Sequence, residues 1–318
     1  MATIARPLTQ DRAAELNVLV RKQRSLWQDA LYRLLRNKAA MVGLAIIILV
    51  GLAAIFAPFI APWDPILQHP DRNTYDPFWG SPQYIDHRFI LGTDQLGRDI
   101  LSRLIYSARV SMIIGFVPVT LIFVIGVSVG MVAGYAGGWT DQILMRVTDI
   151  VYAFPDLLFL LIIMATLRGT DVGKFGGGLP LMFVAIAIVN WVGMARLMRG
   201  QVLSLKEKEF VEAARCIGAT PSRILIRHLF PNALAPAIVA VSFAIPSAML
   251  TEATLSFLGI GVIPPTPTWG VMINEGFAVF TTSPWPVVFP ALCIAVVMLS
   301  FTFLGDGLRD ALDPRMKI

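Results

Sequence analysis

Charged residues are scarce in this sequence. Only 15% of its 318 residues are Asp, Glu, Lys or Arg, whereas 56% are hydrophobic. A soluble fold has no place for so much apolar surface outside its core, and we expect no nucleic-acid partner. Uncharged runs of roughly 20 residues can instead cross a hydrocarbon layer of about 30 Å as helices. The composition therefore predicts an all-α polytopic membrane protein.

Cysteine and histidine are also rare, and neither forms a recognisable site. Cys216 lies in a polar segment and Cys293 in the last apolar run, so we expect no disulfide framework. His69 and His87, with the aspartates near them, match no metal-ligand spacing. The serines, histidines and carboxylates suggest no triad, metal set or acid/base pair. We therefore expect no catalytic residue, metal site or cofactor in this chain.

A nucleotide site is not expected either. The stretch from Gly169 to Lys174 superficially matches a phosphate-binding loop. It is one residue short between its glycines, and Phe175 stands where Ser or Thr must ligate magnesium. If this protein depends on a nucleotide, another subunit has to bind it.

Six apolar runs are expected to be transmembrane helices. They cover residues 39–61, 110–136, 143–166, 177–198, 233–257 and 286–305. Lys and Arg resist translocation, and they concentrate in segment 1–38, loop 199–232 and tail 307–318, so these parts are predicted to be cytoplasmic. Segment 62–107 is predicted to be external, and residues 108–306 to form a five-helix core. Both termini would then be cytoplasmic.

The N-terminal segment should contain a helix of its own. Between residues 25 and 37, apolar side chains fall on one side of a helix: Leu26, Trp27, Leu31, Leu34 and Leu35. This pattern predicts an amphipathic helix on the inner membrane surface. A simple extension of the first span is the alternative. The rest of the segment is largely polar and the first apolar run is long, so we expect no cleavable signal peptide.

Glycines and carboxylates mark the spans. Gly126, Gly130 and Gly134 recur at four-residue intervals, a spacing that lets helix backbones approach closely within a membrane. Carboxylates in a span are expensive and generally face protein or water. Asp149 has Arg146 three residues before it as a local partner, whereas Asp156 has no basic residue nearby.

The role of a third intramembrane carboxylate stays open. Glu252 lies near the outer end of the fifth span, where it could face a translocation path or bond to backbone broken by Pro246. In the outer loop that follows, Trp269 and Glu275 are candidates for contact with a docking protein. For Asp156 we favour a structural role over contact with a substrate.

A charged island, residues 209–232, separates two uncharged runs. Ser204 and Glu207 have the spacing of a capping box at the start of a helix. From there an apolar face is predicted at Phe210, Ala214 and Ile217.

A sharp corner is expected to follow this first short helix. Gly218 stands where helices commonly end in a left-handed residue. Thr220 and Pro221 are typical of the start of a second helix, which Pro231 should stop or kink. The island therefore predicts a helix, a corner and another helix outside the membrane.

The same island resembles a known motif. Glu212-Ala213-Ala214, then Gly218 after three residues, then Pro231 thirteen further on, is similar to the EAA loop of membrane subunits of ATP-binding cassette (ABC) importers. In that family the loop forms coupling helices that dock into a groove on the ATPase subunit. The resemblance implies that Glu212 is a polar anchor, that Ala213 and Ala214 permit close approach, and that Gly218 supplies the corner. Arg215 belongs to the same coupling surface.

Two further stretches resemble the dipeptide/oligopeptide permease subfamily: Leu91 to Arg109 and Thr251 to Gly261. In the first of these, Thr93 or Asp94 can cap a helix whose other face would be kept wet by charges: Arg98, Asp99 and Arg103. The EAA pattern itself is departed from at His228 and Phe230, without loss of the predicted corner.

The resemblance implies a type I ABC importer permease fold in a bacterial cytoplasmic membrane. It also implies a homologous permease subunit, two ATP-binding subunits that bind ATP and Mg, and an external substrate-binding protein. The implied cargo is a dipeptide or oligopeptide, with nickel or glutathione as alternatives. A proton- or ion-coupled secondary transporter is the alternative from another class, but it would need paired ionisable groups near mid-membrane.

Overall fold

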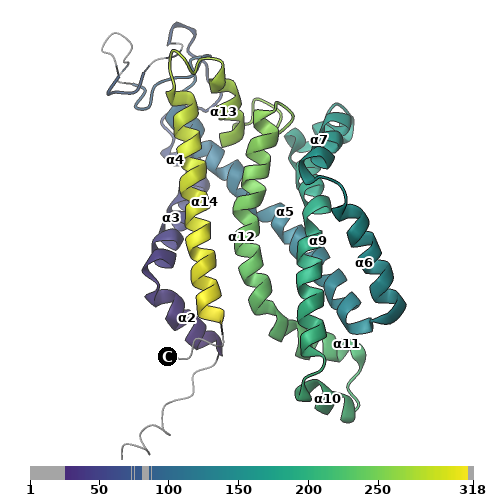
Figure 1. Ribbon diagram of the computed structural model, residues 1–318. Helices are drawn as coiled ribbons and strands as arrows, with labels where there is room; N and C mark the ends of the chain where they lie inside the picture. The colour runs from purple at the N-terminus through teal and green to yellow at the C-terminus, as the bar shows by residue number, and fades with distance from the viewer. Residues whose placement is uncertain (1–25, 73, 75, 81–85, 87, 314–318) are drawn as a thin grey trace, which may run out of the picture.

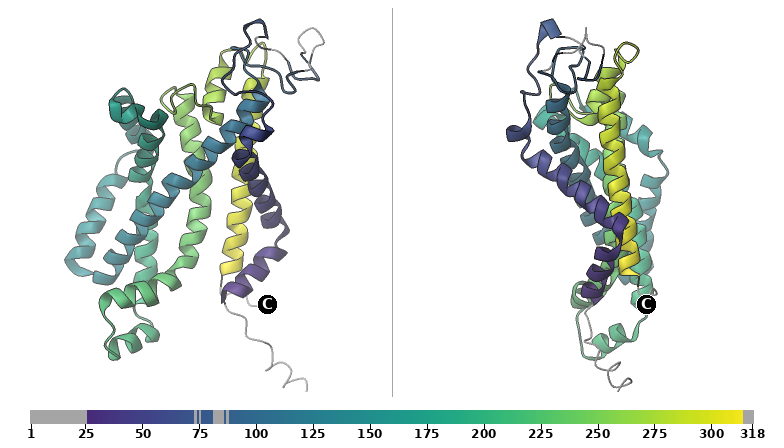
Figure 2. Two further views of the ribbon diagram at one scale, coloured as in Figure 1. Left: turned by 180° about the vertical axis from the view of Figure 1, so that it is seen from behind. Right: turned by 90° about the vertical axis from the view of Figure 1, so that its left-hand side faces the viewer.

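The computed structural model describes residues 26–72, 74, 76–80, 86 and 88–313. These residues are mostly helical and contain no β-strand. Long helices stand side by side as a bundle, and α5 crosses behind the others (Figures 1 and 2). The elements are α2 (Leu26–Arg36), α3 (Lys38–Ile55), α4 (Ala57–Ile60), η1 (Pro70–Arg72), α5 (Ile100–Ala136), α6 (Gly138–Tyr152), α7 (Asp156–Leu167), α8 (Asp171–Lys174), η3 (Phe175–Gly178), α9 (Leu179–Leu205), α10 (Glu209–Cys216), α11 (Pro221–Arg223), η4 (Ile224–Leu229), α12 (Phe230–Phe257), α13 (Trp269–Phe277) and α14 (Trp285–Leu312).

Within the described residues, five helices are long and apolar enough to cross a membrane. The count rises to six if α6 and α7, which are bent by 78° at the break between them, form one span. The six predicted spans are recovered on that count. The third is not one straight helix, because Pro155 disfavours helical backbone at the residue before it.

Two predicted helix ends are wrong. α5 begins at Ile100 rather than residue 110, and its cap is Asp99, whose carboxylate accepts a bond from the N–H of Ser102 at 2.8 Å. Thr93 and Asp94 therefore do not cap it. The last helix continues to Leu312, so residues 307–312 of the expected polar tail are helical.

The predicted capping box is also absent. α9 continues through Ser204 to Leu205, and α10 begins after Lys208, which makes no side-chain capping bond. The helix α9 therefore extends beyond the predicted span, residues 177–198.

The N-terminal helix is distinct from the first span, which excludes the alternative of a simple extension. Asn37 separates α2 from α3, and its side chain accepts a hydrogen bond from the N–H of Ala40 at 3.2 Å. Arg33 on α2 donates to the carbonyl of Asp313 at 3.3 Å, which ties this helix to the end of α14. Leu31 and Leu35 remain more than half exposed, as an amphipathic surface helix requires.

The glycine stripe packs α5 against α9, as the sequence predicts. A Cβ placed on Gly126 would lie 2.6 Å from Met194 Cβ, and one on Gly130 only 2.3 Å from the carbonyl oxygen of Ala195. A Cβ on Gly134 would lie 2.9 Å from the carbonyl oxygen of Arg199. No side chain larger than hydrogen fits these positions, so glycine determines how closely the two helices pack.

Pro231 does not end a helix. The chain is helical from Pro221 to Phe257, and the turn ahead of Pro231 is a π-helix, Ile224–Leu229. Since proline has no N–H to donate, a widened turn before it accommodates the missing bond. The helix changes direction here, from the short α11 into the long α12 (Figure 1).

Candidate functional site

The corner between α10 and α11 is built as the sequence predicts. Gly218 has a φ of +79°, in the left-handed region. Its N–H donates to the carbonyl of Arg215 at 2.9 Å, and the N–H of Ala219 donates to the carbonyl of Ala214 at 3.0 Å. These two bonds form the Schellman motif that ends a helix on glycine. α11 then starts with Pro221 in its first turn, beyond the ends of the long helices (Figure 1).

α10 exposes a polar face and buries a narrow apolar one. Glu212, Ala213 and Arg215 are exposed. Ala214 is only 3% exposed and belongs, with Val211, to the hydrophobic core. The small side chain of Ala214 therefore serves the internal contact between α10 and the π-helix, rather than a close approach by another subunit.

The predicted apolar face of α10 is confirmed at Ala214 and wrong at Phe210 and Ile217. Val211 and Ala214 are buried, whereas Phe210 is 39% and Ile217 is 84% exposed. Pro231 lies away from the corner, exposed in the first turn of α12. The surface that another protein can reach thus combines charged side chains with the exposed Ile217.

A brace at the same end of the bundle joins α6 to α9. Arg199 donates from Nε and Nη2 to the two carboxylate oxygens of Asp141, both at 2.6 Å. Lys206, at the end of α9, donates to the carbonyl of Gly134 at 3.3 Å. A two-point guanidinium–carboxylate contact fixes direction as well as distance. The end of α9 that leads into α10 is therefore held firmly to the corner between α5 and α6.

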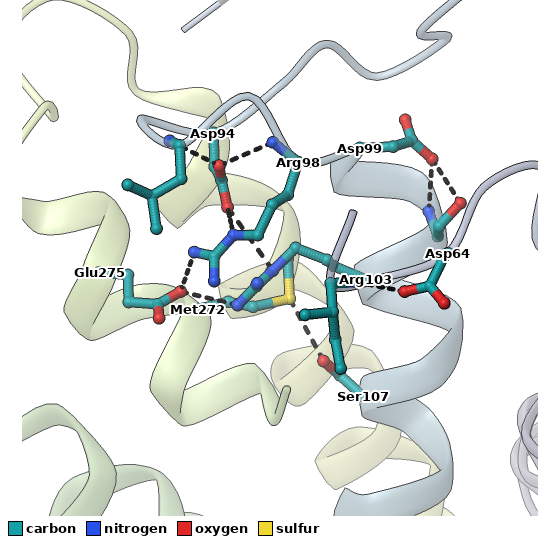
Figure 3. A network of polar contacts seen from close by, with 11 residues as sticks. Asp64, Asp94, Arg98, Asp99, Arg103, Ser107, Met272 and Glu275 are labelled. Carbon is teal, nitrogen blue, oxygen red and sulfur yellow. Dashed lines mark hydrogen bonds and ion pairs between the residues drawn. The ribbon is translucent and has the colours of Figure 1, made fainter. Parts of the chain in front are cut away.

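A cluster of buried charges lies at the opposite end of the bundle (Figure 3). Arg98 donates to Asp94 at 2.7 Å and to Glu275 at 2.6 Å, and Arg103 donates to the same Glu275 oxygen at 2.6 Å. Side-chain exposure is 4% for Arg98 and 1% for Arg103. Two guanidinium groups and two carboxylates balance in charge, which makes their burial tolerable.

The buried cluster corrects two predictions. Arg98, Asp99 and Arg103 do not keep a helix face wet, because all three are at most 4% exposed. Burial raises the pKa of the Asp99 carboxyl, against the lowering effect of its bonds from Ser102. Glu275 is not free for a docking protein, since both arginines hold it.

Trp269 is not a docking residue either. It is 2% exposed, and its indole N–H donates to the carbonyl of Leu104 at 3.2 Å. The sequence contains one signal of this cluster: Glu275 is the lone carboxylate of the loop 262–284, which has no Lys or Arg. Such a charge needs a cation from elsewhere in the fold, and Arg98 and Arg103 in the stretch Leu91 to Arg109 supply it.

The carboxylates of the spans have different surroundings. Asp149 pairs with Arg196 on α9 at 2.8 Å, and not with Arg146 as predicted. Asp156 is exposed in the first turn of α7, with no ion pair among the described residues. Glu252 is 1% exposed and accepts hydrogen bonds from two hydroxyls.

The two proposed roles of Glu252 are both replaced by a third. Its Oε1 accepts from Ser256 at 2.6 Å and from Thr268 at 2.7 Å, so it bonds to side chains rather than to backbone broken by Pro246. Thr268 in turn caps α13 by accepting from the N–H of Val271 at 3.0 Å. Glu252 therefore joins the C-terminal end of α12 to the start of α13.

A bundle of membrane-spanning helices with a rigid helix corner beyond one end defines the class of integral-membrane permeases. The chain belongs to the family described as binding-protein-dependent transport system inner membrane component, whose model matches residues 126–318. A second model, the N-terminal TM domain of oligopeptide transport permease C, matches residues 25–77. The two matches cover most of the chain and agree with one another.

Curated relatives are similar over nearly the whole chain. The oligopeptide transport system permease protein OppC of Bacillus subtilis is 42% identical over 305 residues, 96% of this chain and 95% of the relative. The dipeptide transport system permease protein DppC of the same organism is 39% identical over 98% of this chain and 92% of the relative. The glutathione transport system permease protein GsiD of Escherichia coli is 40% identical, with 92% of each chain covered.

A solved structure supports the fold. The MetNI methionine ABC transporter in an inward-facing conformation contains a chain that aligns with a TM-score of 0.55 at 17% identity. The alignment covers 67% of this chain and 98% of that one. The protein is thus a multi-pass membrane permease with the predicted type I ABC importer fold.

Proposed function

We propose that this chain is one of two homologous permease subunits of an ATP-driven importer for dipeptides and oligopeptides. Two separate ATP-binding subunits would bind ATP and Mg and hydrolyse the nucleotide, and an external substrate-binding protein would deliver the cargo. The observation that carries this proposal is the exposed Gly218 corner in a chain that is 42% identical to OppC over 96% of its length. Glutathione is the second candidate cargo, because the relative GsiD is 40% identical.

We assign the corner to the cytoplasm. The corner, α2 and the end of α14 share one end of the bundle (Figure 1), and Lys and Arg concentrate in these segments. The described residues between 62 and 99, together with α13, lie at the other end and would be external. Segment 1–38 and tail 307–318 are predicted to be cytoplasmic, although residues 1–25 and 314–318 lie outside the described residues.

The proposed mechanism is mechanical. The Schellman motif and the buried Val211 and Ala214 make α10 and its corner one rigid unit, so a force on Glu212 or Arg215 moves the whole unit. The Asp141–Arg199 brace then passes that movement from the end of α9 to α6. Closure of the ATP-binding subunits would in this way turn the pathway between its inward- and outward-facing forms.

We expect Glu212→Arg and Gly218→Pro to abolish ATP-driven uptake while the spans stay folded. Glu212→Arg reverses an exposed charge on the docking surface. Gly218→Pro replaces a φ of +79° by about −65° and removes the bond to Arg215, so the corner changes direction. The measurements are co-purification of the ATP-binding subunits and peptide uptake by the reconstituted complex.

The control is Asp171→Arg. Asp171 is also an exposed carboxylate in the first turn of a short helix, but at the opposite end of the bundle. It should leave assembly and uptake unchanged. Wild-type uptake by the Glu212→Arg variant would contradict the proposal, and uptake that survives without ATP but collapses with the proton gradient would favour the ion-coupled alternative.

A further inference from the structure

The last two turns of α6 form an exposed surface about halfway along the length of the bundle. Thr148 is the one buried residue of this helix. Val151 packs against Trp191, Val192 and Ala195, which lie near the centre of α9 (Leu179–Leu205). The end of α6 therefore lies level with the middle of α9, and its exposed side chains must meet lipid, protein or water there.

The backbone next to this surface cannot face lipid. α6 ends at Tyr152 and α7 begins at Asp156, with a bend of 78°. The three residues between the helices are all exposed, and Pro155 supplies no N–H. Irregular backbone at membrane depth is tolerated only where protein covers it or water reaches it. The break therefore faces either another protein or a water-filled space on this side of α6.

An exposed ion pair lies one turn before the break. Arg196 Nη2 donates to Asp149 Oδ1 at 2.8 Å, and the side chains are 40% and 61% exposed. The Arg196 guanidinium lies 4.3 Å from the centre of the Tyr152 ring, which holds it in place from one side. Charges within a span generally line a substrate path or a water-filled cavity.

The contact between Asp149 and Arg196 uses only part of the hydrogen-bonding capacity of the two side chains. One hydrogen bond joins the two groups among the described residues, although a carboxylate can accept at both oxygens and a guanidinium has five N–H donors. Asp149 Oδ2 is thus able to accept from an ammonium group, and the remaining N–H groups of Arg196 are able to donate to a carboxylate. This combination is complementary to a zwitterion.

Peptides of different sequence have in common a terminal ammonium group, a terminal carboxylate and backbone amides. We propose that Asp149 and Arg196 form a binding site on the wall of the translocation pathway for the charged termini of the peptide. A short peptide can place its ammonium terminus on Asp149 and its carboxylate on Arg196. In a longer peptide the termini lie further apart than the two paired side chains, so one terminus binds at a time. Tyr152 keeps the guanidinium oriented. This inference rests on the proposed function as a peptide importer. In this inference the permease binds the termini of the peptide and does not distinguish its side chains.

The test uses the complete importer in lipid vesicles, with peptide-loaded binding protein at saturating concentration. Asp149→Asn and Arg196→Gln are each expected to lower peptide uptake about tenfold, the effect of losing one charge-assisted hydrogen bond. ATP hydrolysis and co-purification of the subunits should stay at wild-type levels, so the number of peptides imported per ATP falls. Arg196→Lys keeps the charge and should retain most of the uptake.

The double variant Asp149→Asn with Arg196→Gln separates binding from structure. A binding site predicts that the double variant stays as defective as the single ones, since neither terminus is held. Restoration of uptake in the double variant would mean that the pair is only a brace between α6 and α9. Loss of the homologous permease from the purified variants would mean that this face is a subunit contact. Either result, or unchanged uptake in the single variants, overturns the inference.

The two proposals fail differently. If wild-type vesicles import no peptide on addition of ATP, the importer function itself is wrong. If wild-type vesicles import peptide and the two single variants match them, the importer function stands and the binding site does not.

Discussion

Glu275→Leu is expected to destabilise the protein by about 3–5 kcal/mol, because it leaves buried charges without a partner. The Glu275 carboxylate accepts from Arg98 and from Arg103, each at 2.6 Å. After its removal Asp94 alone faces two buried guanidinium groups, so one positive charge is uncompensated. The measurement is the apparent Tm of the purified permease complex, which should fall by several degrees.

Two comparisons make this prediction specific. Asp86→Asn breaks a 2.7 Å ion pair whose arginine, Arg88, is 57% exposed, and such pairs contribute about 0–1 kcal/mol, so the apparent Tm should barely change. The double variant Glu275→Leu with Arg98→Leu restores the charge balance and should recover part of the lost stability. A Tm equal to wild type for Glu275→Leu alone would show that the cluster does not hold α13 to α5.

The cluster also explains what sequence analysis could and could not predict. The motif before α5 was noticed as a string of charges, but the partner of Arg103 is 172 residues away in the chain. Helical periodicity assigns charged positions to a solvated face by default, since nothing local indicates burial. Only the packing of α13 against α5 turns these charges inward, and no spacing rule contains that information.

The features that were predicted correctly are local ones. Gly218 ends α10 with a positive φ because a left-handed residue is needed within one turn of the helix end. The glycines of α5 were recognised from a four-residue interval within a single helix. In both cases the responsible residues lie within a few turns of one another, so sequence is sufficient.

The bend between α6 and α7 falls between these cases. The apolar residues on both sides of Pro155 predicted one continuous span over residues 143–166. Hydropathy measures the length of an apolar run and does not detect a change of direction within it. The residue before a proline is biased away from the helical region, but Pro118 lies inside α5 and Pro246 inside α12, so that rule alone does not locate the break.

The second large effect is expected at Gly130. The Cβ of Gly130→Ala would lie 2.3 Å from the carbonyl oxygen of Ala195 and 2.7 Å from Met198 Cβ. Backbone atoms cannot rotate away, so α5 and α9 must separate over several turns. Overpacking of this kind typically costs about 1–3 kcal/mol, and Gly130→Leu should prevent folding of the core altogether.

Gly193→Ala on α9 is the matched control, because a Cβ there meets no atom within 4 Å. Alanine has the higher helix propensity, by about 1 kcal/mol in an exposed helix, so this variant should be as stable as wild type or slightly more so. The same substitution is thus expected to have opposite effects on the two facing helices, measured as apparent Tm and as yield of folded protein. If Gly130→Ala behaved like Gly193→Ala, the close α5–α9 contact would not limit stability. The Arg199–Asp141 brace would then have to hold the two helices together instead, since it ties α9 to the start of α6 at the corner where α5 ends.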